Sequence, residues 1–209
     1  NAIEEAVKLK ESGLATETIS VSIGDEKSQD VLRTSMAMGI DRSILVKSQN
    51  TIEPLAIAKT LKKIIETEQP ELVLMGKQAI DDDSNQTGQI LSALLNWPQG
   101  CFISNLKIEN NKVLISREID EGIENLETSL PAILTCDLRL NTPRFASLPN
   151  IMKAKKKPLD IIDIETLDID TSPKIQTIKV IEPPKRKAGI MVNDVKELVQ
   201  KLKYEAKVI

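Results

Sequence analysis

The stretch that decides the fold is ELVLMGKQAIDDDSNQTGQILSALL, residues 71–95. It begins with a short apolar run, Glu71–Met75, which is typical of a buried parallel strand and stops at Gly76. Helical spacing of apolar residues starts at Thr87 and continues to Leu95. The polar loop in between therefore leaves the carboxyl end of a strand, where ligands bind in open α/β sheets.

The same alternation of strand and helix extends toward the N-terminus. Apolar periodicity predicts helices at Asn1–Glu11, Lys27–Met38 and Leu55–Thr67, and β-branched apolar runs predict strands at Thr18–Ile23 and Ser43–Val46. Elements that alternate in this way form a parallel sheet with right-handed crossovers. The opening helix also suggests a preceding strand that this chain does not contain.

After Trp97-Pro98 the pattern changes to strict alternation of apolar and polar residues, the period of a half-exposed strand. Three segments share it: Phe102–Ile108, Lys112–Ile119 and Asn125–Leu130. Turn residues separate them, which predicts an antiparallel meander. One more buried strand follows at Ala132–Cys136. The expected fold class is therefore α/β, with a Rossmann-like parallel sheet, crossover helices and an added antiparallel meander.

Several classes of function are excluded by the composition. The chain has no histidine, which removes the commonest general base and every Ser–His or Cys–His nucleophile pair. A net charge of -3 and an aromatic content of 2% argue against nucleic acid as a partner. No apolar run approaches the roughly 20 residues that span a bilayer, so we expect no membrane-embedded segment. Two cysteines, Cys101 and Cys136, fit a reducing, intracellular location.

Short polar side chains gather where the loop after residue 76 meets its helix, at Ser84, Asn85, Gln86 and Thr87. A helix N-terminus offers N–H groups and a positive dipole end, which suit a phosphate. The glycine patterns of P-loops and dinucleotide folds are absent, and a plain capped helix would show the same residues. The adjacent acids Asp81, Asp82 and Asp83 suit magnesium, but such runs are usually solvated, and we expect no metal.

Two further stretches carry chemical interest. Strand periodicity places Glu118 on the face opposite Arg117; such acids can do acid–base work but more often cover a solvated face. In residues 144–158, Leu148, Ile151 and Met152 stand beside four lysines. Lysines can steer an acidic partner while apolar residues anchor it. A basic surface loop without a partner and a nucleic-acid patch are the alternatives.

Prolines and charged runs interrupt all periodicity after Asn141. We expect residues 1–146 to form the nucleotide-binding domain, residues 147–157 a partner-recognition loop, and residues 158–209 an extended arm. The arm ends in an amphipathic helix at Asn193–Lys203. An arm that cannot bury its own apolar residues usually lies on another surface, here a partner subunit.

Three long stretches, GKQAIDDDSNQTGQ, REIDEGIENLETSLPAILT and DLRLNTPRFASLPNIMKAKKK, resemble the beta-subunit family of electron-transfer flavoproteins. The resemblance covers nearly the whole chain. It implies an alpha-subunit partner, an FAD held mainly by alpha near the interface, and an AMP in beta. The AMP phosphate loop matches Asp81–Thr87, with Asn85, Gln86 and Thr87 as phosphate contacts. Members with a second FAD in place of AMP have a different loop.

The resemblance also implies roles for the remaining candidates. Leu148 matches the anchor that enters a pocket on acyl-CoA dehydrogenases, and Glu118 matches a glutamate near the flavin. Further partner contacts are implied at Pro149, Ile151, Met152, Lys153 and Lys156. The implied function is an electron carrier, not an enzyme. It passes electrons through FAD to a membrane quinone oxidoreductase, in bacterial cytoplasm or the mitochondrial matrix.

Two features of the family and of the chain keep other functions open. Family members carry a first strand and a loop ahead of the opening helix, and both contribute to the AMP pocket. A nucleotide-binding regulatory or scaffold module without a redox role would use the same phosphate loop. A hydrolase or ligase of the related α/β type is disfavoured by the missing histidine and P-loop.

Overall fold

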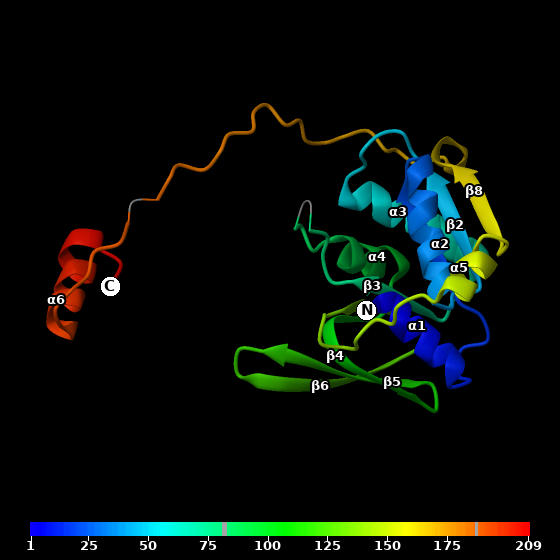
Figure 1. Cartoon of the computed structure of the whole chain (residues 1–209), viewed down its shortest axis with the longest axis horizontal. Helices are drawn as coiled ribbons and strands as arrows, with labels where there is room; N and C mark the ends of the chain where they lie inside the picture. Colours follow the sequence, from blue (N-terminus) through cyan, green and yellow to red (C-terminus); the bar gives the residue numbers. More distant parts are fainter. Residues whose placement is uncertain (81–82, 187) are drawn as a thin grey trace. The chain divides into compact units, whose positions relative to one another are not determined.

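The computed structural model describes residues 1–80, 83–186 and 188–209. The chain divides into a compact unit, Asn1–Lys174, and a C-terminal unit, Ile175–Ile209. Helices and strands alternate through the first part of the compact unit, and three antiparallel strands follow (Figure 1). The predicted α/β class and the added meander are thereby confirmed.

The strands of the compact unit form two sheets. A three-stranded parallel sheet has the order β1–β2–β8, and a five-stranded mixed sheet has the order β3–β7–β4–β5–β6. The first comprises β1 (Ile19–Gly24), β2 (Arg42–Lys47) and β8 (Leu159–Asp163). The second comprises β3 (Leu72–Gly76), β7 (Ala132–Cys136), β4 (Gln99–Glu109), β5 (Lys112–Ile119) and β6 (Gly122–Ser129). Because β3 lies at a sheet edge, its residues are only half buried, where the sequence predicted full burial.

Helices cover these sheets and close two apolar clusters. One joins Val7 of α1 and Met36 of α2 to Ala154 of α5; the other joins Ala58 of α3 and Leu91 of α4 to Ile133 and its neighbours. The helices are α1 (Ala2–Glu11), α2 (Gln29–Met38, preceded by the 3-10 turn η1, Glu26–Ser28), α3 (Pro54–Glu68), α4 (Thr87–Leu95) and α5 (Leu148–Ala154).

The C-terminal third of the compact unit corrects two expectations. Residues 147–157 are not a loop, because α5 forms there, and the Ser147 hydroxyl caps it by accepting from Asn150 N. The arm does not begin at residue 158 either. Leu159–Asp163 pairs in parallel with β2, and the 3-10 turn η2 (Ile164–Leu167) buries Ile164. Residues 159–167 therefore belong to the compact unit, where the sequence predicted the start of an extended arm.

The C-terminal unit contains a short α-helix, α6 (Val195–Gln200), which continues as a π-helix, η3 (Lys201–Ala206). This agrees with the predicted helix, except that Asp194 and not Asn193 is the cap, accepting from Glu197 N. Val195, Leu198 and Val199 remain exposed within the unit. Within the described part of the chain, no helix combines the length and the apolar character that crossing a membrane requires.

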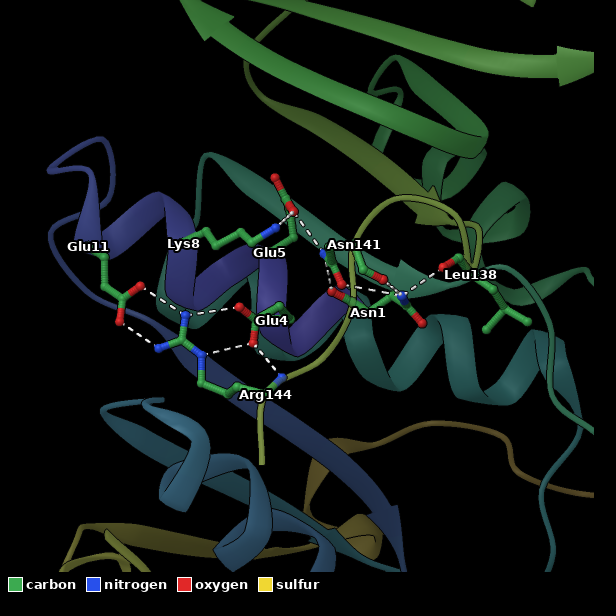
Figure 2. Close-up of polar contacts among 8 residues, drawn as sticks. All are labelled: Asn1, Glu4, Glu5, Lys8, Glu11, Leu138, Asn141 and Arg144. Carbon is green, nitrogen blue, oxygen red and sulfur yellow. Dashed lines mark hydrogen bonds and ion pairs between the residues drawn. The ribbon is translucent and has the colours of Figure 1, made fainter. Parts of the chain in front are cut away.

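A polar network fastens the segment after β7 to α1 (Figure 2). Arg144 forks between two glutamates of α1: its Nε and Nη2 donate to Glu4 at 2.9 Å each, and its Nη1 donates to Glu11 at 2.6 Å. Asn141 Nδ2 donates to the Glu5 carboxylate at 2.8 Å. The Glu4 side chain is 5% exposed, and its hydrogen bonds with Arg144 lower its pKa despite this burial.

Replacing Arg144 with methionine keeps a long apolar stem but leaves the buried Glu4 carboxylate without a cation. We expect the unfolding free energy at pH 7 to fall by about 2 kcal/mol. Because the folded-state pKa of Glu4 lies below its ordinary 4.5, the contribution is complete above that pH and is lost as pH falls through the folded-state pKa. Urea titrations should therefore show a smaller difference between variant and wild type in acid.

Lys8→Met is the matched control. The Lys8 side chain is 47% exposed and its Nζ lies 4.0 Å from the Glu5 carboxylate, so its loss should change stability by less than about 0.5 kcal/mol. Equal losses in the two variants, or an Arg144→Met deficit that is unchanged in acid, would contradict this account of the network.

Candidate functional site

Parallel pairing of β3 with β7 brings the carboxyl ends of these two strands together at one end of the sheet. Gly76 and Cys136 are in register, so Lys77 and Asp137 leave the sheet side by side. Lys77 N donates to Cys136 O at 3.2 Å, and Lys77 Nζ donates to Asp137 Oδ2 at 2.7 Å. This hydrogen bond is the main reason that the pKa of Asp137 is lowered. Sequence analysis did not single out this pair.

The predicted phosphate loop follows the carboxyl end of β3 and leads to α4. Asp83 and Asn85 both adopt left-handed backbone conformations, with φ of 52° and 50°. The Asp83 carboxylate accepts from Gln78 Nε2, and Asn85 Oδ1 accepts from Gln89 Nε2 at 2.9 Å. Ser84 is half buried between Asp83 and Asn85. Asp81 and Asp82 lie outside the described residues, and the described ones contain no cluster of acids or cysteines placed to hold a metal.

The N-terminus of α4 has the properties of a ligand site. Gln86 stands at the cap position, and its side chain makes no capping hydrogen bond within the described structure, as is also the case for the cap residues of α1, α2 and α3. Thr87 opens the first turn, which carries no acid. An uncapped, acid-free helix N-terminus favours an anion.

One neighbour of this helix end also favours a bound molecule, and another sets how closely α4 packs on the sheet. Gln89 Oε1 is buried and finds no hydrogen-bond partner among the described residues. A buried acceptor without a partner is unfavourable, so a donor on a ligand would relieve it. At Gly88, a Cβ would lie 2.7 Å from Thr135 Cγ2, so this glycine lets α4 approach β7 closely.

Glu118 lies on β5, on the face of the meander opposite Arg117, as predicted. Its Oε2 is 2.7 Å from Arg139 Nη1, and its cross-strand neighbour on β6 is Ile123, which is 69% exposed. Arg117 instead pairs with Glu124 at 2.5 Å. The structure thus places Glu118 on an open surface beside an exposed apolar residue and a cation that the sequence analysis missed.

The exposed face of α5 carries the predicted apolar group. Leu148 is 79% exposed, Met152 63% and Ile151 40%. Pro149, Lys153, Lys155 and Lys156 are exposed as well. Lys157 differs from the other three lysines, because its Nζ donates to Met36 O and Ile40 O at the end of α2. Burial accordingly lowers the pKa of Lys157, and three lysines, not four, accompany the apolar group.

Comparison with known sequences decides the family. The Electron transfer flavoprotein domain matches residues 1–167. The chain is 54% identical to the electron transfer flavoprotein subunit beta of Bradyrhizobium diazoefficiens, over all of this chain and 84% of that protein. The chain belongs to the electron transfer flavoprotein family. The mitochondrial electron transfer flavoprotein subunit beta of Arabidopsis thaliana is 51% identical over the same shares. The electron transfer flavoprotein subunit beta of Bos taurus is 50% identical over 97% of this chain and 81% of its own length.

Family membership confirms the resemblance drawn from the three sequence stretches and assigns the chain to flavoprotein electron transport. The matched region contains the predicted phosphate loop, Glu118 and α5, and the relatives match beyond it to the C-terminal unit. The predicted phosphate loop, the surface at Glu118 and the exposed face of α5 therefore all lie within one chain of the electron transfer flavoprotein family.

The close approach of α4 to β7 can be tested directly by substitution at Gly88. Gly88→Ala should lower the unfolding free energy by about 1–3 kcal/mol, because the new methyl group meets Thr135 at less than contact distance. Higher helix propensity of alanine, about 1 kcal/mol, acts in the opposite direction and is the smaller effect. Gly76→Ala is the control, because a Cβ there meets nothing within 4 Å. Unchanged or increased stability of Gly88→Ala in urea unfolding would contradict the packing described.

Proposed function

We propose that the chain is the beta subunit of a heterodimeric electron-transfer flavoprotein. It accepts electrons from acyl-CoA and related dehydrogenases and passes them through FAD to a membrane quinone oxidoreductase. The observation that carries the proposal is the exposed apolar group of α5, Leu148 with Ile151 and Met152, beside three exposed lysines in a chain of this family. Such a surface combines an anchor with charges that steer an acidic partner.

The nucleotide of the beta subunit is proposed to be AMP, held at the N-terminus of α4. Asn85, Gln86 and Thr87 would meet its phosphate, since the helix end is uncapped and acid-free. Ser84 and Asp83 flank that contact, and Asp81 and Asp82 complete the loop in sequence. Gln89 Oε1 is an acceptor for a ribose hydroxyl or an adenine amine. The donor set therefore fits a nucleoside monophosphate.

FAD is proposed to lie mainly in the alpha subunit, with Glu118 of this chain near it. When bound, FAD supplies the redox chemistry, and the protein contributes position and electrostatics. Glu118 and the exposed Ile123 lie on one face of the meander, which gives a surface able to shield the cofactor. The C-terminal unit, with exposed Val195, Leu198 and Val199, is proposed to pack on the alpha subunit.

The compartment follows from the source: bacterial cytoplasm or the mitochondrial matrix, since bacterial and mitochondrial relatives both match. The competing function is a nucleotide-binding regulatory or scaffold module without a redox role. It would use the same α4 site, but it gives no role to an anchor beside lysines on α5.

Leu148→Ala in the heterodimer tests the docking surface. We expect kcat/KM for electron acceptance from an acyl-CoA dehydrogenase to fall about 30-fold, which corresponds to about 2 kcal/mol for a central anchor. Bound FAD should be unchanged. Leu55→Ala, at an exposed leucine on α3, is the control and should behave as wild type. An unaltered rate in Leu148→Ala would remove the anchor assignment.

A further inference from the structure

Helix α5 has only seven residues, which is too short to be stable alone in water. It nevertheless turns Leu148 and Met152 outward, and among its residues only Ala154 is fully buried, in the cluster that contains Met36 and Ile40. Ile151 is covered in part, at 40% exposure, so the apolar stabilisation of this seven-residue segment is small. Polar contacts with the rest of the compact unit therefore contribute to holding the helix in place.

Reciprocal hydrogen bonds from two cationic side chains join the C-terminal ends of α5 and α2. Arg33 Nη1 of α2 donates to Ala154 O at 2.8 Å and to Lys157 O at 2.7 Å. In return, Lys157 Nζ donates to Met36 O at 3.0 Å and to Ile40 O at 2.5 Å. The last carbonyls of a helix lack partners within it, and a cation is favourable there. Arg33 of α2 thus supplies a charged donor to the end of α5, and Lys157, three residues after α5, supplies one to the end of α2.

The N-terminal side of α5 is fixed independently. Ser147 caps the helix, and three residues earlier Arg144 forks onto Glu4 and Glu11 of α1. Arg33 and Lys157 act at the opposite end, so α5 is tied at both ends to the body of the compact unit. Its exposed face is left free of these contacts.

We propose that Arg33 is a positioning residue for partner docking: it orders α5 before the dehydrogenase arrives. Its guanidinium donates to the carbonyls at the end of α5, while Leu148 lies on the exposed part of the helix. A surface that is ordered in advance does not lose that conformational freedom on binding, so affinity rises without any new contact. This inference rests on the proposed docking function of α5.

The test uses the complete heterodimer with bound FAD. Arg33→Gln should speed amide hydrogen exchange of residues 150–157 at least tenfold in the free protein. KM for an acyl-CoA dehydrogenase should rise about three- to tenfold, while kcat and FAD content stay constant, because docking and not electron transfer is weakened. Arg33→Lys keeps one charged donor and should restore much of both values. Lys157→Met, which removes the reciprocal pair of bonds, should reproduce the Gln variant.

Arg42→Gln is the control for a general loss of stability. Arg42 bridges Glu17 and Glu68 and has no bond to α5, so exchange at residues 150–157 and KM should match wild type. The proposal is overturned if Arg33→Gln and Lys157→Met leave this exchange unchanged, or if exchange accelerates while KM does not move. Failure of the docking function itself would look different: Leu148→Ala would then leave KM unaltered, and the positioning role would fall with it.

Discussion

The parallel pairing of β3 with β7 is the constraint on which the candidate surfaces depend. Residues 72–76 and 132–136 run in register, so the loop after β3 and the segment after β7 leave the sheet at the same end, where both strands have their carboxyl ends. The first leads to the phosphate loop and α4. The second leads through Asp137 and Arg139 to Arg144 and α5. A register shift of one residue would separate these groups and turn every side chain of the strand to the other face.

Short polar contacts connect the segments that follow the carboxyl ends of β3 and β7. Lys77, at the start of the phosphate loop, binds Asp137, and the Asp137 carboxylate also accepts from the backbone N–H of Arg139. Arg139 reaches Glu118 on the meander. The Asp137 side chain is 9% exposed, so its contact with Lys77 is less screened by water than the pair formed by Arg139 and Glu118. The arrangement gives one buried acid beside two exposed charges, those of Arg139 and Glu118.

Sequence patterns predicted the most regular elements closely. The bounds of α4, β5 and β7 agree with the predicted segments, because a helical pattern, an alternating pattern and a continuous apolar run, respectively, pass through them without interruption. β4 begins three residues before its predicted start, since an irregularity near Phe102, with φ of 58°, breaks the alternation there. β8 escaped prediction because it follows a proline and mixes apolar residues with aspartates.

Side-chain roles were harder to predict than elements. A run of four lysines looks uniform in sequence, yet Lys157 turns inward to cap α2 while its neighbours stay exposed. That difference depends on the position of α2, some 120 residues away in the chain. The proposed role of Glu118 came from family resemblance, since an exposed acid on a strand carries no functional signal by itself. For Leu148, the neighbouring lysines and apolar residues suggested a docking surface, and the resemblance supplied the partner class.

Identification of the nucleotides released from the denatured native complex tests the central claim most directly. The account predicts FAD together with AMP, the first from the interface with the alpha subunit and the second from the α4 site. FAD alone, at two per complex, would contradict the AMP assignment. AMP without any flavin would contradict the electron carrier itself and would favour a nucleotide-binding regulatory module.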